Sequence, residues 1–231
     1  MSIEHTPSAE TVESANDRLA TNYSIDDYYA RSPLPIRLIE KTRLKAIREF
    51  VGDDRGVKIA EVGSGGGHVL RMFGNAKLTA IDVSGKYLDI ARKNLQGCDV
   101  EFIKGEIDKM DPIPSGFDRV ICTEVLEHTR DPRAVLDAIS RMLAPGGRAI
   151  ITVPNDPLII RLKRAVRITP VGWVLRNRIR WGGDEMHLHR WTPSQFRALL
   201  SEHFRVLDEK LAPSRALPIR ACYLCEPKAS H

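Results

Sequence analysis

Two carboxylates and an imidazole lie close together in the sequence, at Glu124, Glu127 and His128. If the segment is helical, this spacing projects all three side chains from one face. Carboxylate and imidazole ligands suit Mn, Fe, Co or Zn more than Mg, without excluding Mg. A divalent ion held there would lower the pKa of an acceptor hydroxyl and orient it. The pattern therefore indicates a candidate metal site that could activate such a hydroxyl.

Two other interpretations fit the same residues. His128 can act as a metal-free general base, since an ordinary imidazole titrates near neutral pH. Alternatively, Glu127 and His128 satisfy helix ends and loop amides and take no part in catalysis. The residues alone leave these three interpretations open.

A glycine-rich loop, Glu61–Gly67, follows an apolar run. Its glycines let the backbone turn sharply and approach a ligand closely, because no side chain stands in the way. Asp82 ends the next apolar run, about 20 residues beyond the first glycine, where a carboxylate can accept both hydroxyls of a ribose. Loop and acid together predict a nucleoside-containing cofactor, with a purely structural turn as the alternative. NAD and ATP are disfavoured, because the third glycine of the dinucleotide motif and the Lys-Ser/Thr pair of the P-loop are missing.

These residues need a scaffold of strands and helices to bring them together. Short apolar runs alternate with helix-like stretches, a pattern that predicts a parallel sheet with helices on both faces. The last two strands are joined by a short turn with no room for a crossover helix, so this pair should be antiparallel. The expected strands are residues 57–62, 77–82, 100–104, 117–123, 148–153, 204–211 and 220–226, and the expected helices are 35–51, 85–96, 132–143 and 193–202.

The composition fits one globular domain. The 231 residues are 42% hydrophobic and 28% charged, which is typical of a packed, ordered chain. The net charge of +5 does not by itself establish a nucleic-acid partner. The four cysteines are too few for a disulfide framework and are expected to be reduced thiols. Because no apolar run is long enough to span a bilayer and no signal core begins the chain, we expect a cytoplasmic protein.

One segment, residues 157–183, concentrates the positive charge, with seven basic residues and no acid. Its apolar residues share one helical face, and Trp173 and Trp181 lie near the edge of that stripe. Three interpretations compete. The segment caps the substrate cleft, or it makes a peripheral contact with the inner face of an anionic membrane to collect a lipophilic substrate, or it binds RNA phosphates. RNA is the least favoured, because two tryptophans make a thin stacking platform for bases.

The ordered motifs resemble those of the class I S-adenosylmethionine-dependent methyltransferases, and most closely the subgroup that contains the ubiquinone-biosynthesis O-methyltransferases. The resemblance covers residues 35–226 and rests on the glycine loop, Asp82, Gly105-Glu106, the run Phe117–His128 and the turn Ala144–Gly147. It implies a doubly wound, Rossmann-like α/β sheet of seven strands in the order 3-2-1-4-5-7-6, with the seventh strand antiparallel.

The resemblance also implies roles toward the cofactor, S-adenosyl-L-methionine. Glu61 would bond the amino group of the methionine part, and Asp82 would hold the ribose hydroxyls. Glu106 would face the adenine amino group, although the family more often has Asp there. Arg37 is a candidate for the methionine carboxylate, and a solvated arginine on a helix face is the favoured alternative. The complete expected set is Glu61, Gly63, Ser64, Gly65, Gly67, Asp82, Val83, Glu106, Ile107, Thr123 and Arg37.

The Glu-x-x-Glu-His pattern also resembles that of the small-RNA 3′-terminal 2′-O-methyltransferases. Those enzymes bind a divalent ion through this pattern and a later histidine, which lies four residues before a Trp-Thr pair. In this chain that histidine is His187 rather than His189. The resemblance therefore implies Glu124, Glu127, His128 and His187 as metal ligands, with the first three also forming the catalytic group.

We therefore expect an S-adenosylmethionine-dependent methyltransferase that acts on a hydroxyl of a small or lipophilic molecule, such as a phenol or a quinone precursor. Two alternatives are an RNA 2′-O-methyltransferase and a cofactor-binding accessory subunit without turnover. The expected organisation is a single methyltransferase domain over residues 35–231, preceded by an N-terminal extension or lid over residues 1–34. A cap insertion at residues 154–192 would interrupt the domain.

Overall fold

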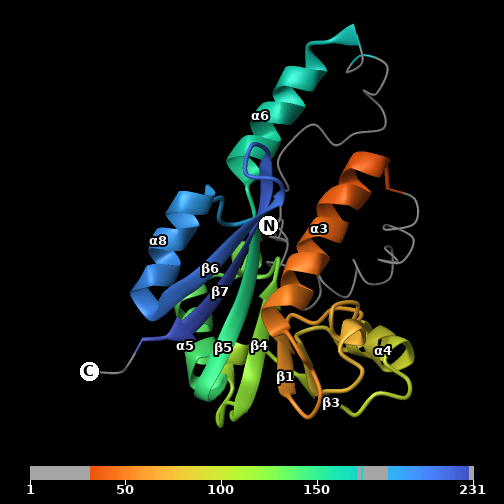
Figure 1. The fold of residues 1–231 in the computed structure, drawn as a ribbon, viewed down its shortest axis with the longest axis vertical. Helices are drawn as coiled ribbons and strands as arrows, with labels where there is room; N and C mark the ends of the chain where they lie inside the picture. The colour runs from red at the N-terminus through yellow and green to blue at the C-terminus, as the bar shows by residue number, and fades with distance from the viewer. Residues whose placement is uncertain (1–31, 171–172, 174–186, 229–231) are drawn as a thin grey trace, which may run out of the picture.

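The computed structural model describes residues 32–170, 173 and 187–228, which form one seven-stranded sheet with helices on both faces (Figure 1). Neighbouring strands follow the order β3-β2-β1-β4-β5-β7-β6, which confirms the prediction. Every neighbouring pair is parallel except those that β7 makes with β5 and β6. The strands are β1 (Lys58–Val62), β2 (Lys77–Asp82), β3 (Val100–Lys104), β4 (Phe117–Thr123), β5 (Leu143–Pro154), β6 (Phe204–Pro213) and β7 (Pro218–Pro227).

The centre of the sheet is buried on both faces. Ile59 and Ala60 of β1 and Val120 and Ile121 of β4 are fully buried, as expected for parallel strands between two helical layers. From β1 the chain builds the sheet first toward β3 and then toward β6, so the strand order reverses between β1 and β4. Open α/β sheets bind ligands at such a switch point, outside the carboxyl ends of the strands.

Two helices pack against each face of the sheet. Helices α3 (Leu34–Val51) and α4 (Gly85–Asn94) lie on one face, and α5 (Pro132–Met142) and α8 (Pro193–His203) lie on the other (Figure 1). Apolar side chains of each pair form a separate core with the strand residues they cover. The two cores hold the sheet between them, so its carboxyl edge is a rigid platform for side chains.

Side chains fix where three of these helices begin. Ser84 accepts the backbone N–H of Tyr87 before α4. Asp131 caps α5 immediately before a proline in the first turn. Thr192 and Gln195 form a capping box at the start of α8. These caps set the short connections between strand ends and helices, and the residues of the candidate site lie in such connections.

Strand β5 begins earlier than predicted. We expected residues 148–153, whereas β5 starts at Leu143, which pairs with Phe117 of β4. Residues 144–147 then bulge out of register, and regular pairing resumes between Arg119 and Arg148. The glycine-containing turn that was expected to separate helix and strand is thus part of an irregular strand. The other predicted strands and helices agree with the structure to within two residues at each end.

The predicted cap insertion begins with a helix that extends beyond the end of the sheet. This helix, α6 (Asp156–Arg167), stands away from the other helices (Figure 1), and Asp156 is its one buried residue. Residues 171–172 and 174–186 of the insertion lie outside the described residues, as do residues 1–31 of the expected lid. No described helix is long and apolar enough to cross a membrane.

Candidate active site

Asp82 ties the glycine loop to the end of β2. Its Oδ2 atom accepts the N–H of Gly65 and its Oδ1 atom accepts the N–H of Ser84, both at 2.8 Å. The N–H of Gly63 donates to the carbonyl of Ile81 at 2.8 Å. A carboxylate offers about four acceptor positions, so Asp82 can order the loop and still accept ribose hydroxyls. This arrangement fits the predicted role.

Gly63 is the position at which the loop most strictly requires glycine. Its φ is +69°, and a Cβ atom added there would lie 2.3 Å from Cγ2 of Val125. Backbone strain and this clash act together, so Gly63→Ala should lower the free energy of unfolding by about 2–4 kcal/mol in urea denaturation. The control is Gly74→Ala, where an added Cβ has no neighbour within 4 Å. Equal losses in the two variants would contradict the assigned strain.

Glu61 is a buried carboxylate at the start of the loop. It is 1% exposed, and Thr123 Oγ1 donates to its Oε1 atom at 3.3 Å. Its Oε2 atom has no hydrogen-bond partner among the described residues. Burial, partly offset by the charge of Arg43, raises the pKa of Glu61 to about 8. The ammonium group of the methionine part would satisfy this oxygen and lower the pKa of Glu61. Glu61 therefore fits its predicted role, and Thr123, also in the expected set, holds the other carboxylate oxygen.

Glu61 should make the stability of the ligand-free protein depend on pH. Because burial raises its pKa from 4.5 to about 8, the folded state loses stability relative to the unfolded state as pH rises between these values. Glu61→Gln should therefore stabilise the protein at pH values above the pKa that Glu61 has in the folded state, and should have little effect near its pKa in the unfolded state. The variant should also weaken binding of S-adenosylmethionine. Urea denaturation at both ends of this range measures the effect. The exposed Glu101→Gln serves as control, and a pH-independent gain for Glu61→Gln would contradict the account.

The remaining predicted cofactor residues differ in their surroundings. Glu106 follows β3 and pairs with Lys109 in the turn η2 (Ile107–Lys109), while Ile107 is buried behind it. Ser64 is buried, and Val83 is half-buried beside Asp82. Arg37 is exposed in the first turn of α3. The first four positions follow strand ends at the carboxyl edge of the sheet, so their assignment to the cofactor stays a prediction that the geometry permits. Arg37, in contrast, has the exposed surroundings of a solvated arginine.

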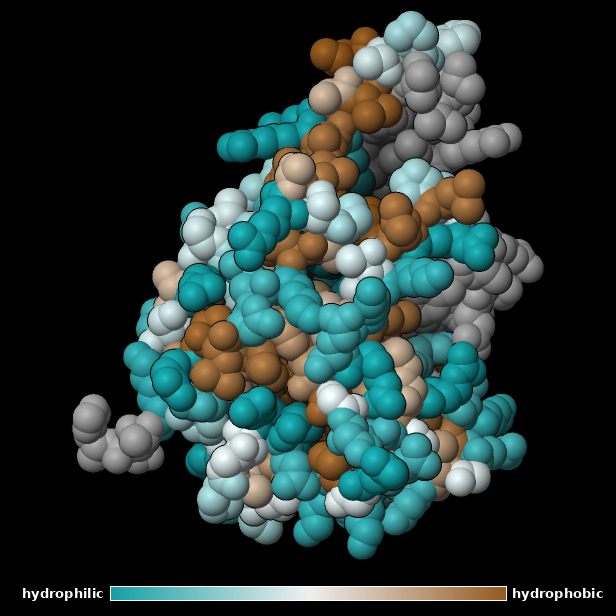
Figure 2. All heavy atoms as spheres, viewed as in Figure 1, coloured by the Kyte–Doolittle hydropathy of each residue, from teal (hydrophilic) through white to brown (hydrophobic). Residues whose placement is uncertain are grey.

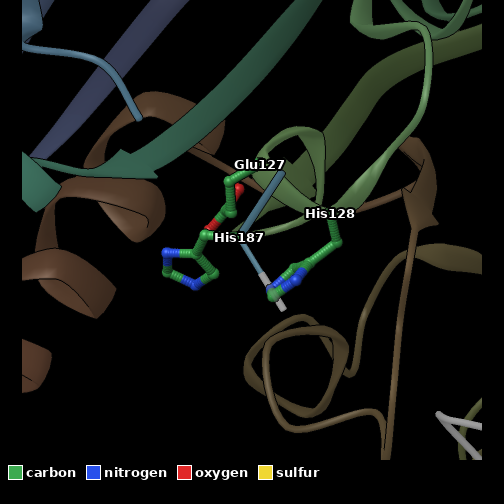
Figure 3. A group of neighbouring side chains, drawn as sticks. All are labelled: Glu127, His128 and His187. Carbon is green, nitrogen blue, oxygen red and sulfur yellow. The ribbon is translucent and has the colours of Figure 1, made fainter. Parts of the chain in front are cut away.

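The second part of the site is a group of three side chains beyond β4 (Figure 3). Glu127, His128 and His187 each offer one ligand atom, and these atoms lie within 4.8 Å of one another. The rings of His128 and His187 meet edge-on, with centroids 4.7 Å apart. We call these three residues the Glu127 cluster. It unites a strand-end turn, η3 (Leu126–His128), with a residue 59 positions later in the chain.

The carboxylate of the Glu127 cluster is suited to a cation. Glu127 is 1% exposed, and neither of its carboxylate oxygens has a hydrogen-bond partner among the described residues. Burial, followed by the negative charge of Glu124, raises the pKa of Glu127 well above its ordinary range. A buried carboxylate without partners is costly. Two imidazoles beside it complete a donor set that fits a divalent ion.

Glu124 is paired with Arg220 and does not join the Glu127 cluster, which corrects the expected helical face. The turn η3 covers only residues 126–128, and Glu124 has a left-handed φ of 55°. Its Oε2 atom lies 2.8 Å from Nε of Arg220, and its Oε1 atom accepts Thr152 Oγ1 at 3.2 Å. The charge of Glu124 still acts on Glu127. Its carboxylate, however, is paired with Arg220 and lies outside the group of neighbouring ligand atoms.

Comparisons with known proteins identify the relatives of the chain. A family model described as a methyltransferase domain matches residues 60–151. The chain is 29% identical over 184 residues to a ubiquinone biosynthesis O-methyltransferase of Xylella fastidiosa, which covers 70% of this chain and 74% of the relative. It is 31% identical over 154 residues to the mitochondrial ubiquinone biosynthesis O-methyltransferase of Schizosaccharomyces pombe, which covers 59% of this chain and 56% of that protein. The chain thus spans little more than half of this second relative.

A solved structure supports the same assignment of fold. The N-methyltransferase NodS from Bradyrhizobium japonicum, in complex with S-adenosyl-L-homocysteine, superposes with a TM-score of 0.66 at 18% identity, over 94% of this chain and 99% of that one. The chain belongs to the class I S-adenosylmethionine-dependent methyltransferases. In this methyltransferase, the segment that matches the family model runs from β1 to β5 and includes η3. His187 and α6 lie beyond it.

Two residues of the methyltransferase's site were not predicted from its sequence. Arg220 comes from β7, and a lone arginine in a strand carries no signal of its role. Asp156 lies 2.6 Å from His187, from Oδ2 to Nδ1. A weak signal did exist for Asp156, because it follows β5 at the carboxyl edge of the sheet and precedes a proline in the first turn of a helix.

Proposed function

We propose that this methyltransferase transfers the methyl group of S-adenosylmethionine to a hydroxyl of a small, lipophilic acceptor of the phenol or quinone-precursor type. The observation that carries the proposal is the Glu127 cluster. It adjoins the predicted cofactor loop, since Val125 packs against Gly63. The names of the two relatives, O-methyltransferases of ubiquinone biosynthesis, agree with a hydroxyl acceptor.

The residues divide the work between the cofactor and the acceptor. Methyl transfer from a sulfonium is an in-line displacement, so the direction of the methyl group must be fixed. Glu61 and Asp82 would hold the methionine and ribose parts. A hydroxyl is a poor nucleophile until it loses its proton, and the imidazoles of His128 and His187 can orient it and accept that proton. A divalent cation held by the Glu127 cluster would lower the pKa of a nearby hydroxyl.

Removal of metal tests that part of the proposal. Exhaustive chelation should abolish turnover, and addition of single metals should restore it, with Mn, Fe, Co or Zn more effective than Mg. The affinity for S-adenosylmethionine should not change, because Glu61 and Asp82 do not belong to the cluster. Full activity after chelation would exclude the metal and leave His128 as a metal-free base.

We further propose that α6 contacts an anionic membrane surface, from which a lipophilic acceptor is collected. Leu162, Val166 and Ile168 are 37%, 37% and 87% exposed, and Trp173 beyond the helix is 68% exposed. Figure 2 shows hydrophobic side chains gathered along α6 and again near the start of α3. Four basic residues belong to the same helix, and basic amphipathic helices bind anionic interfaces. They are Arg161, Lys163, Arg164 and Arg167.

Liposome flotation tests the membrane contact. The protein should float with vesicles that contain phosphatidylglycerol, and it should remain in the bottom fraction when the vesicles are pure phosphatidylcholine. Added salt should release it from the anionic vesicles. Replacing Leu162, Val166 and Ile168 together by serine should abolish flotation. The control is Arg71→Ser, which removes an exposed charge elsewhere on the molecule. If the protein does not bind anionic vesicles, the proposed membrane contact is wrong and α6 acts as a cap over the acceptor instead.

An unbiased screen tests the class of acceptor. Cell extract is separated into lipid, aqueous and RNA fractions, and each is incubated with the protein and with cofactor that carries a deuterated methyl group. We expect the label in a phenolic compound of the lipid fraction. Label confined to RNA would favour a 2′-O-methyltransferase of RNA, and binding of the cofactor without transfer to any fraction would favour an accessory subunit.

A further inference from the structure

We infer that Asp156 is a positioning residue of the active site, which holds the ring of His187 in one orientation and one tautomer toward Glu127 and His128. The inference rests on the proposed role of the Glu127 cluster. Its starting point is the contact of 2.6 Å between Asp156 Oδ2 and His187 Nδ1, in which the two side chains are 6% and 12% exposed. The two residues are 31 positions apart, on either side of the basic segment 157–183.

Helix capping does not account for the burial of Asp156. The capping residue of α6 is its neighbour Asn155, whose side chain accepts the N–H of Leu158 at 3.3 Å and donates to the carbonyl of Pro218 at 2.9 Å. An acidic residue in the first turn is favoured by the positive end of a helix even when it is exposed. Burying it is costly unless it is paired, and the structure pairs it with His187.

The backbone around His187 is fixed independently of Asp156. The N–H groups of Leu188 and His189 donate to the carbonyl of Glu127 at 2.8 and 3.2 Å, and the His189 ring contacts the carbonyl of Thr129 at 3.0 Å. These contacts place the backbone of residue 187 beside η3 and do not involve its ring. The ring itself meets His128 edge-on and lies 2.6 Å from Asp156 through Nδ1, and the Asp156 contact is directional because it acts on one ring nitrogen.

The contact also selects a tautomer. An ionised carboxylate can only accept a hydrogen bond, so Nδ1 of His187 carries the hydrogen, and Nε2 is the nitrogen through which the ring would act as base or ligand. Carboxylates that hold a histidine in this way commonly govern the affinity of the histidine for metal, and their loss costs roughly 10- to 100-fold. The chain contains a matched pair away from the site, in which Asp137 Oδ1 lies 2.7 Å from His203 Nδ1.

Histidine ¹⁵N NMR tests the tautomer directly, without turnover or metal. Two-bond ¹H–¹⁵N spectra of the full-length protein are recorded at alkaline pH, and the His187 signals are assigned by their loss in His187→Gln. We expect the Nδ1–H tautomer in the wild-type protein. Asp156→Asn should shift it toward Nε2–H, because an amide can donate to Nδ1. The Nε2–H tautomer in the wild-type protein would overturn the inference, whatever the protein methylates.

Binding of Co²⁺ to the metal-free protein supplies the second measurement. Calorimetry and the visible spectrum of bound Co²⁺ should show affinity that is roughly 10- to 100-fold weaker in Asp156→Asn, with the affinity for S-adenosylmethionine unchanged. Asp137→Asn should bind Co²⁺ like the wild type. Equal affinity in all three proteins would overturn the inference. If the wild type binds no Co²⁺, the metal part of the proposed function fails, and the NMR result alone decides the role of Asp156.

Discussion

Replacement of Asp82 by alanine is expected to weaken binding of S-adenosylmethionine by about 100-fold or more. Hydrogen bonds to a charged group are each worth roughly 1.5–3 kcal/mol, and every 1.4 kcal/mol is about tenfold in affinity. Asp82 would make two such bonds to the ribose. It also holds the N–H groups of Gly65 and Ser84, so its loss relaxes the loop that the cofactor must meet. Isothermal titration calorimetry measures the change.

A milder variant separates binding from loop order. Asp82→Asn keeps one acceptor oxygen and the shape of the side chain, so it should retain more stability in urea than Asp82→Ala while still binding the cofactor weakly. Asp89→Ala, which removes an exposed carboxylate paired with Arg92 on α4, should leave the affinity unchanged. Wild-type affinity in both Asp82 variants would place the cofactor elsewhere.

Glu127→Gln should lower kcat by about 100-fold or more, the scale on which a positioned acid–base or ligand group contributes, with the affinity for S-adenosylmethionine unchanged. Its effect on stability should be the opposite of its effect on catalysis. Burial and the charge of Glu124 raise the pKa of Glu127. As pH rises above the ordinary pKa of a glutamate, ionisation of Glu127 therefore lowers the stability of the metal-free folded state. At alkaline pH the glutamine variant should resist urea better than the wild type.

The matched control for Glu127→Gln is Glu101→Gln on β3, which is exposed. It should change neither kcat nor stability measurably. If the Glu127→Gln variant loses both activity and stability, Glu127 stabilises the fold and its role in catalysis is not supported. A protein that keeps full activity would remove Glu127 from the site.

Most of the fold could be predicted because the residues of each strand and helix carry the pattern that indicates it. The buried strands β1, β2 and β4 are short apolar runs, and Asp131 and Thr192 stand at helix starts with the capping chemistry that such positions favour. The bulge before Arg148 could not be predicted, because it depends on how Leu143 pairs with Phe117 across two strands.

The candidate site could be predicted only where the segment that carries a functional residue also carries the sequence pattern that predicts its position. Glu61 and Asp82 stand at the ends of their own strands, so their places follow from those strands. The spacing of Glu124 suggested a shared helical face. It did not reveal the left-handed backbone at this residue, nor the pairing with Arg220, which lies 96 residues later. The role of Asp156 likewise depends on His187, which lies on the other side of the basic segment 157–183.

The most direct test of the proposed reaction is the position of the transferred methyl group on a defined acceptor. The protein is incubated with ¹³C-methyl-labelled S-adenosylmethionine and a catechol that carries an apolar tail, and the product is examined by carbon NMR and mass spectrometry. We predict a single labelled methyl group on a phenolic oxygen, formed far more slowly by Asp82→Ala and Glu127→Gln. A methyl group on carbon, or on nitrogen of an amine offered beside the catechol, would contradict the account.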